Sequence, residues 1–204
     1  MSEDKANHAA GKTYEGVVIL VRQPLDVICS LRELCHETEN YLFELHDYVR
    51  MHTSPLVAFA HAWADSHTRV LRFEADHPEW CIRMRYEDLV KDPAGQMDRV
   101  FRFLGEPADA AEIVAKAMKG RDTVGLGDWK TYQKSTISES SVGRSKELSP
   151  QTTANLLGIL GPVMSQFGYD VSPPEKVADP EQARRDHVLG LMSSKLLAEA
   201  RDKK

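Results

Sequence analysis

The sequence predicts a mixed α/β fold in which a parallel sheet is flanked by helices. An uninterrupted β-branched and aliphatic run at 17–21 ends at Arg22, and a helical segment begins at once with Pro24. Such a run is typical of a strand that is buried on both faces of a parallel sheet. A second strand-like run at 80–86 stands between helical segments, and this alternation is typical of α/β proteins.

Helix breakers, caps and apolar spacing predict the order of the elements. Proline favours the first turn of a helix, because its fixed φ suits that turn and its missing N–H is not needed there. Ser54-Pro55 and Ser149-Pro150 therefore mark helix starts, and Gly168 marks a helix end. The predicted elements are a strand at 16–21, a helix from about 24 to 35 or beyond, a segment at 36–50 that extends this helix or forms another, a long helix from 55 to about 77, a strand at 80–86, helices at 93–104 and 107–119, a long loop at 120–147, a helix at 150–168 and a last helix at 180–204.

The junction between the first strand and the first helix predicts an anion site. Ligands of open α/β sheets bind beyond the carboxyl ends of the strands. Arg22 stands at that end, and Ser30 follows one turn into the helix beyond the acidic Asp26. A cation and a hydroxyl beside free helix N–H groups have the chemistry to hold a phosphate.

These residues also carry a family resemblance. The stretch VRQPLDVICS, residues 21–30, resembles the 3′-phosphate-binding signature of sulfotransferases that use 3′-phosphoadenosine 5′-phosphosulfate (PAPS). The resemblance implies that Arg22 and Ser30 hold the 3′-phosphate of this cofactor. It also implies a P-loop-NTPase-like fold, here incomplete at the N-terminus and with a helical C-terminal extension.

Two later stretches resemble the same family in the same order. RMRYEDLVKDP at 83–93 and VFRFLGEP at 100–107 resemble a strand, turn and helix of the family, and imply that Tyr86 lies near the adenine. SVGRSKELSPQ at 141–151 implies that Gly143 and Arg144 belong to a loop whose arginine closes over the 3′-phosphate.

Two further details of the later stretches are a departure from the family pattern and an additional resemblance. Ser145 stands where bacterial members often carry tryptophan. The run Gly127-Asp128-Trp129-Lys130 resembles part of the cofactor-closing loop of cytosolic members, and this resemblance makes Lys130 a secondary candidate for a phosphate ligand, with a surface lysine beside a docked tryptophan as the alternative.

The N-terminal part departs from the family pattern. Family members place a strand, a phosphate loop for the 5′-phosphosulfate and usually the catalytic base ahead of the first signature, where this sequence has only residues 1–15. The triplet Gly11-Lys12-Thr13 lacks the preceding strand, and Ala6 stands where a Walker-type loop needs glycine. The catalytic residues are therefore unknown from the sequence, with His36 and His52 as alternative bases.

Composition narrows the functional classes. The formal net charge of −5 argues against a nucleic-acid-binding protein. No apolar run approaches the about 20 residues of a membrane span, and the absence of a signal peptide predicts a cytoplasmic protein. The three cysteines are predicted to be reduced thiols, since their number is odd and none forms a CxxC pair. Glu33 and His36 lack a partner set, so the sequence predicts no metal site.

The sequence predicts four parts: a flexible tail at 1–14, a sulfotransferase-like domain at 15–170, a linker at 171–179 and a C-terminal helix at 180–204. One side of this last helix is apolar, which favours a homo-oligomer or a partner chain. Three functions stay open. The first is PAPS-dependent sulfuryl transfer to a hydroxyl or amine of a small molecule or carbohydrate. The others are a non-catalytic relic of the fold that binds a nucleotide or partner, and a kinase-like enzyme.

Overall fold

The computed structural model describes residues 16–41, 44–119, 141–174, 181 and 184. The chain divides into two compact units. The first comprises Met1–Val21 and Phe73–Ser140, and the second comprises Arg22–Arg72 and Ser141–Lys204.

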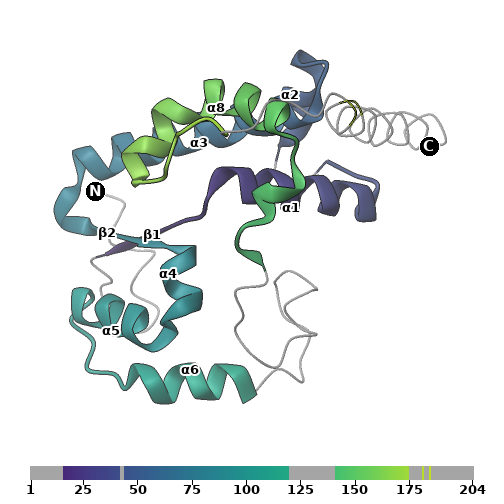
Figure 1. Ribbon diagram of the computed structural model, residues 1–204. Coiled ribbons are helices and arrows are strands. Elements are labelled where there is room, and N and C mark those ends of the chain that lie inside the picture. Colours follow the sequence, from purple (N-terminus) through teal and green to yellow (C-terminus); the bar gives the residue numbers. More distant parts are fainter. Residues whose placement is uncertain (1–15, 42–43, 120–140, 175–180, 182–183, 185–204) are drawn as a thin grey trace, which may run out of the picture. The chain divides into compact units, whose positions relative to one another are not determined.

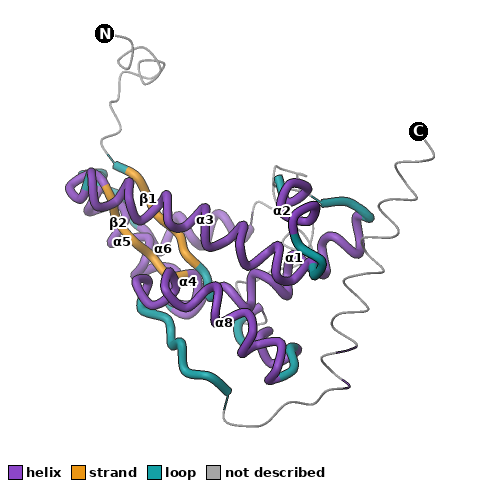
Figure 2. The backbone as a smooth tube through the Cα atoms, turned by 90° about the horizontal axis from the view of Figure 1, so that it is seen from above, coloured by secondary structure: helices purple, strands orange, loops and turns teal. Residues whose placement is uncertain are grey.

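The first unit holds a two-stranded parallel sheet followed by helices. Strand β1 (Val17–Val21) pairs with β2 (Cys81–Arg85) in a register that aligns the two first residues and the two last residues. Figure 2 shows the two strands side by side. Both strands lie where the sequence predicts them, and the mixed α/β class is confirmed, although helices predominate among the described residues.

The expectation that β1 is buried on both faces is wrong for the described part of the chain. Ile19 and Val21 are buried, whereas Val18 is 40% exposed and Leu20 is 50% exposed. Successive side chains of a strand point to opposite faces, so one face of β1 is covered and the other is not. In the described residues the sheet consists of β1 and β2; on this second face Met84, the partner of Leu20 in β2, is buried.

Helices follow β2 without an intervening loop. Tyr86 is the first residue of α4 (Tyr86–Lys91), a short helix that the sequence analysis missed. The predicted helix at 93–104 is α5 (Pro93–Phe103), and the Asp92 side chain caps it by accepting a hydrogen bond from the N–H of Gly95 at 3.0 Å. The next helix, α6 (Ala110–Lys119), begins a few residues later than predicted.

The second unit is helical. It contains α1 (Pro24–Thr38), α2 (Leu45–Met51), most of α3 (Pro55–Asp76), the 3₁₀ turn η4 (Arg144–Glu147), α8 (Pro150–Met164) and the 3₁₀ turn η5 (Ser165–Phe167). The segment at 36–50 thus resolves into the end of α1 and a separate helix, because α1 ends at Glu39 in the left-handed conformation. The left-handed Gly168 ends the last helical segment as predicted.

The core of the second unit lies among these helices. Both α8 and η4 pack on α1 (Figure 1). Apolar side chains at helical spacing on three helices are almost completely buried, which accounts for the packing. They are Ile28 and Cys29 of α1, Leu56, Phe59 and Trp63 of α3, and Leu156, Leu160 and Met164 of α8.

A half-buried histidine packs against this core. The ring of His67 stacks on Trp63 with centroids 3.9 Å apart and meets the edge of Phe167 at 5.6 Å. Its Nδ1 lies 2.9 Å from the carbonyl oxygen of Trp63, and this contact requires a proton on Nδ1. Desolvation by burial lowers the pKa of His67, and the hydrogen bond to Trp63 opposes this shift only in part.

His67 makes the stability of the protein depend on pH. The unfolded chain takes up a proton near pH 6.5, whereas the folded chain does so only at lower pH, so stability falls as pH drops below neutrality. For one proton, the slope of the unfolding free energy reaches at most about 1.4 kcal/mol per pH unit. Urea titrations of His67→Phe should show a smaller loss between about pH 7 and 5.5 than the wild type. The exposed His36→Gln variant is the control and should keep the slope of the wild type. If the unfolding free energy of His67→Phe depends on pH as steeply as that of the wild type, His67 is not the group responsible.

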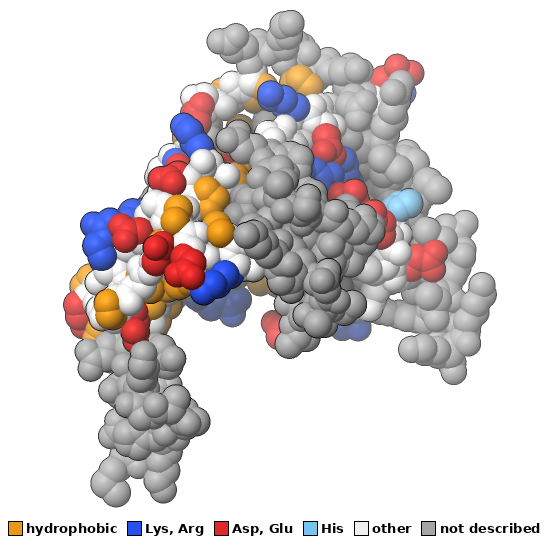
Figure 3. Space-filling model, turned by 90° about the horizontal axis from the view of Figure 1, so that it is seen from below, with side chains coloured by type: hydrophobic (Ala, Val, Ile, Leu, Met, Phe, Trp, Pro, Cys, Tyr) orange, Lys and Arg blue, Asp and Glu red, His pale blue; other side chains and the backbone are white. Residues whose placement is uncertain are grey.

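Several predicted segments lie outside the described residues. They are the tail at 1–14, most of the loop at 120–147, most of the linker at 171–179 and nearly all of the helix at 180–204. Among the described helices, none combines the length and the apolar character that crossing a membrane requires. On the face drawn in Figure 3, basic and acidic side chains are interspersed and do not form a patch of one sign.

Candidate functional site

A buried carboxylate joins the first signature segment to the third. Asp26, in the first turn of α1, is only 1% exposed. Its Oδ2 accepts a hydrogen bond from the N–H of Gly143 at 2.7 Å, and its Oδ1 accepts one from the N–H of Ser145, also at 2.7 Å. Asp26 therefore fixes the backbone of the Gly143–Ser145 loop against α1, across more than a hundred residues of sequence.

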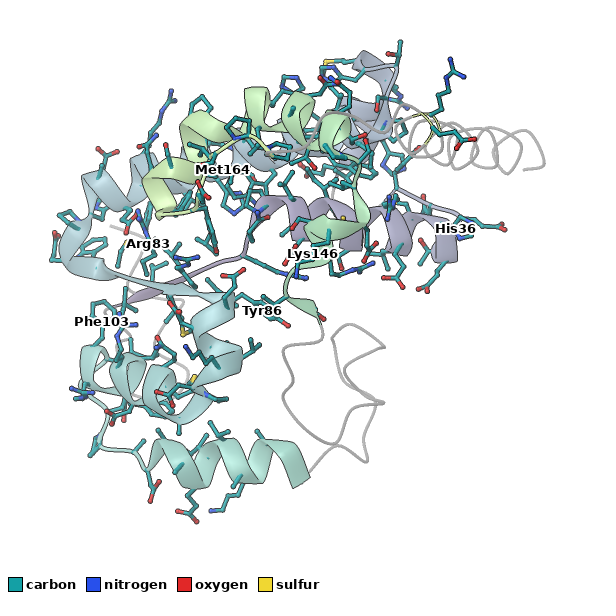
Figure 4. The ribbon with its side chains drawn as sticks, viewed as in Figure 1. His36, Arg83, Tyr86, Phe103, Lys146 and Met164 are labelled. Carbon is teal, nitrogen blue, oxygen red and sulfur yellow. The ribbon has the colours of Figure 1, made fainter. Side chains whose placement is uncertain are left out.

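The conformation of this loop explains its glycine. Gly143 has φ of 80° and ψ of 20°, the left-handed region that glycine adopts without steric cost. This conformation precedes the turn η4, which places Lys146 beside α1 (Figure 4). Backbone hydrogen bonds to Asp26 thus hold the loop at Ser145, the position where bacterial family members often carry a tryptophan side chain.

Arg22 reaches the same loop from the start of α1. Its Nη2 donates a hydrogen bond to the carbonyl oxygen of Ser141, two residues before Gly143. The expectation of free N–H groups at this helix start is wrong, because the Gln23 side chain caps them. Its Oε1 accepts from the N–H of Leu25 at 2.5 Å and of Asp26 at 3.1 Å. Any anion held here must therefore be bound by side chains more than by the helix terminus.

Arg144 lies in an ion-pair network on the same side of α1. Its Nε and Nη2 donate to the two carboxylate oxygens of Glu147 at 2.8 and 3.2 Å, and its Nη1 donates to Glu33 at 2.7 Å. Arg32 adds a further ion pair to Glu147 at 2.8 Å. With Arg22 and Asp26 included, three guanidinium groups face three carboxylates.

The network shifts the proton affinities of its members. The hydrogen bond to Arg144 is the largest influence that lowers the pKa of Glu147, and the reciprocal bond raises the pKa of Arg144. Both side chains therefore stay ionised at neutral pH. Desolvation by burial raises the pKa of Cys29 to about 11, so this thiol stays protonated; its Sγ donates to the carbonyl of Arg144 at 3.4 Å.

The structure gathers some of the predicted site residues in the second unit. Arg22 bonds Ser141 and Gly143 bonds Asp26 at the start of α1, whereas the guanidinium of Arg144 bonds Glu33 farther along the same helix. Ser30 is half buried on α1 one turn after Asp26. Tyr86 belongs to the first unit, where it begins α4 directly after β2 (Figure 4). Lys130 lies outside the described residues.

The two histidines considered as alternative bases have different surroundings. His36 is exposed in the last turn of α1 (Figure 4), and His52 stacks on His61 with ring centroids 4.3 Å apart. Among the described residues, no group of histidine, cysteine and acidic side chains has the arrangement to hold a metal ion.

The sequence analysis missed the partners that organise this site. Asp26 was recognised as an acid in the first turn of a helix and as a match to the first signature, but its bonds to the distant loop carry no local sequence signal. Glu33 and Arg32 were missed for the same reason. Glu147 follows Arg144 by three residues, and this helical spacing is the one local signal that indicates their ion pair.

Comparisons with known proteins agree with the first two signature segments. Residues 16–110 match the model of the family described as the sulfotransferase family. No curated protein and no solved structure matches the chain significantly. The matched segment contains Arg22, Ser30 and Tyr86, and Asp26 connects it to the Gly143–Ser145 loop, which lies beyond the match. Residues 16–110 of this chain are thus similar to the sulfotransferase family, whose general activity is the transfer of a sulfuryl group.

Proposed function

We propose that the second unit binds the 3′-phosphate of PAPS and that the protein is a sulfotransferase specific for this donor. The observation that carries the proposal is the pair of hydrogen bonds that Asp26 accepts from the N–H groups of Gly143 and Ser145, here called the Asp26 bracket. It brings the Gly143–Ser145 loop to the helix that follows Arg22 and bears Ser30, the two residues of the first signature. In the family these segments bind one phosphate, and here they are held together by a buried carboxylate.

The donor groups at this place fit a phosphate dianion. A guanidinium carries five N–H groups, and the described bonds of Arg144 use three of them, which leaves two. Arg22 supplies a second guanidinium, and Ser30 a hydroxyl donor on the same helix. Hydrogen bonds between ionised partners are the strong ones, and arginine is the residue best shaped for phosphate oxygens.

The carboxylates around Arg144 set the conditions of binding. Glu33 and Glu147 compete with an anion for its guanidinium, since all of these groups accept from the same donors. A phosphate therefore binds only if its contacts with both Arg144 and Arg22 are together more favourable than the contacts that the carboxylates make with Arg144 alone. A ligand without the 3′-phosphate has no such advantage, so the site selects nucleotides by that group.

Anchoring the donor at its 3′-phosphate would serve the chemistry at its other end. PAPS supplies the sulfuryl group: the bond from sulfur to the 5′-phosphate oxygen breaks, a bond to the acceptor oxygen or nitrogen forms, and the acceptor proton passes to a general base. Binding energy from a remote part of a substrate orients its reacting part. We propose a hydroxyl or amine of a small molecule or carbohydrate as the acceptor.

Calorimetry with three nucleotides tests the proposal. Two additional charge-assisted contacts of about 1.5 kcal/mol each correspond to about 100-fold in affinity. Adenosine 3′,5′-bisphosphate should therefore bind about 100-fold more tightly than adenosine 5′-phosphate, and more tightly than ATP. Preference for ATP would replace the proposal by a kinase-like function. Binding of the bisphosphate without sulfuryl transfer from PAPS to any acceptor would support only the non-catalytic alternative.

A further inference from the structure

A groove in the second unit lies apart from the Asp26 bracket and has no assigned role. It is lined by α1, α2 and α3 and has a volume of about 660 Å³, within the range of small-molecule sites. On α1 the groove is lined by Val27 and Leu31, which lie one turn apart on a different face from Asp26 and Ser30. Its floor is apolar and largely made of core side chains.

Acidic side chains dominate the charge of the groove. Glu44, Asp47 and Asp65 line it and are exposed to solvent, whereas Arg69 is the one basic residue among the described lining residues. Asp47 has an ion pair with Arg50 at 3.3 Å, but both side chains are mostly exposed, so this pair is weak. Three carboxylates against one guanidinium give the lining a formal charge of −2.

Aromatic side chains stand beside these carboxylates. Tyr48 donates a hydrogen bond from Oη to Asp65 at 3.0 Å, and with desolvation this bond raises the pKa of Tyr48 and keeps the phenol protonated. Phe59 and Trp63 are buried and also line the groove. The indole N–H of Trp63 is buried and has no hydrogen-bond partner among the described residues.

We infer that this groove binds an amphiphilic organic cation, a flat apolar body that carries an ammonium group. The apolar body fits the floor formed by Phe59 and Trp63. The ammonium group fits the edge, where Asp47 and Asp65 supply negative charge and Tyr48 supplies an aromatic face. Ammonium groups bind to aromatic faces and carboxylates together, while anions of the same shape are repelled.

Three indole probes that differ in charge test this inference without any nucleotide. Tryptamine is a cation, tryptophol is neutral and indole-3-acetate is an anion at neutral pH. NMR titration of the full chain should give tryptamine about tenfold higher affinity than tryptophol, and indole-3-acetate the weakest binding. The probes carry no phosphate, and the groove variants locate their binding, so the result does not depend on the proposed transferase function.

Variants locate the binding and keep the test decisive. Asp47→Asn combined with Asp65→Asn should remove the preference for tryptamine, while Asp98→Asn on α5 keeps it. Ala62→Leu narrows the groove and should weaken all three probes; thermal melting confirms that each variant folds. Equal affinities for the three probes, no saturable binding, or a tryptamine preference that survives the double substitution would overturn the inference.

Discussion

Asp26→Asn should destabilise the protein by about 2–4 kcal/mol and lower its affinity for adenosine 3′,5′-bisphosphate about tenfold. The carboxylate accepts from the N–H groups of both Gly143 and Ser145. An amide of the same size has only one oxygen, so its NH₂ group would face one of these donors. The loop would then leave α1 and take Arg144 with it. Urea denaturation and calorimetry measure the two effects.

The calorimetric measurement shows whether Asp26 positions the Gly143–Ser145 loop for the nucleotide or only supports the core. Asp98→Asn removes an exposed carboxylate on α5 that pairs with Arg102 and should change stability by less than about 1 kcal/mol. If Asp26 only supports the core, Asp26→Asn lowers stability but leaves the affinity of the folded protein for the bisphosphate unchanged. That result would separate Asp26 from the nucleotide site.

Arg22→Ala should reduce the affinity for adenosine 3′,5′-bisphosphate about tenfold, the share of one of the two charge-assisted contacts, while the affinity for adenosine 5′-phosphate stays nearly the same. The reason is that Arg22 is proposed to contact only the 3′-phosphate. Arg22→Lys should recover little of the loss, because an ammonium group cannot offer the paired N–H groups of a guanidinium. Calorimetry with both nucleotides on each variant measures the difference.

Arg102→Ala is the matched control for the loss of one positive charge. Arg102 lies in the first unit, and its side chain is 71% exposed. If the two alanine variants weaken bisphosphate binding equally, the effect is a general one of net charge and Arg22 has no special role. Arg22 also holds the carbonyl of Ser141, so thermal melting must accompany the binding data.

The elements of this fold could be predicted largely because their signals are local. Pro24, Pro55, Pro93 and Pro150 each open a helix where the sequence indicates one, since proline acts through its own backbone. The burial of β1 could not be predicted in this way. The apolar side chain of Leu20 looks like that of a core residue, but its exposure depends on which other elements cover the sheet.

Some residues of the candidate site could also be predicted from the sequence, whereas others could not. Arg22, Ser30 and Gly143 were found because their spacing resembles a family signature. The role of Asp26 depends on two backbone N–H groups more than a hundred residues away, and the carboxylates around Arg144 come from α1 and η4. Sequence reasoning also predicted free N–H groups at the start of α1, because it did not anticipate that the Gln23 side chain would turn back and cap them.

We propose that Arg22, Ser30 and Arg144 recognise a phosphate by its position on the ribose. The most direct test compares adenosine 3′,5′-bisphosphate with adenosine 2′,5′-bisphosphate, which has the same atoms and charge but carries one phosphate on the neighbouring carbon. We predict that the 3′ isomer binds at least about tenfold more tightly, because a preorganised set of donors loses contacts when its anion moves. Equal affinities for the two isomers would contradict the account.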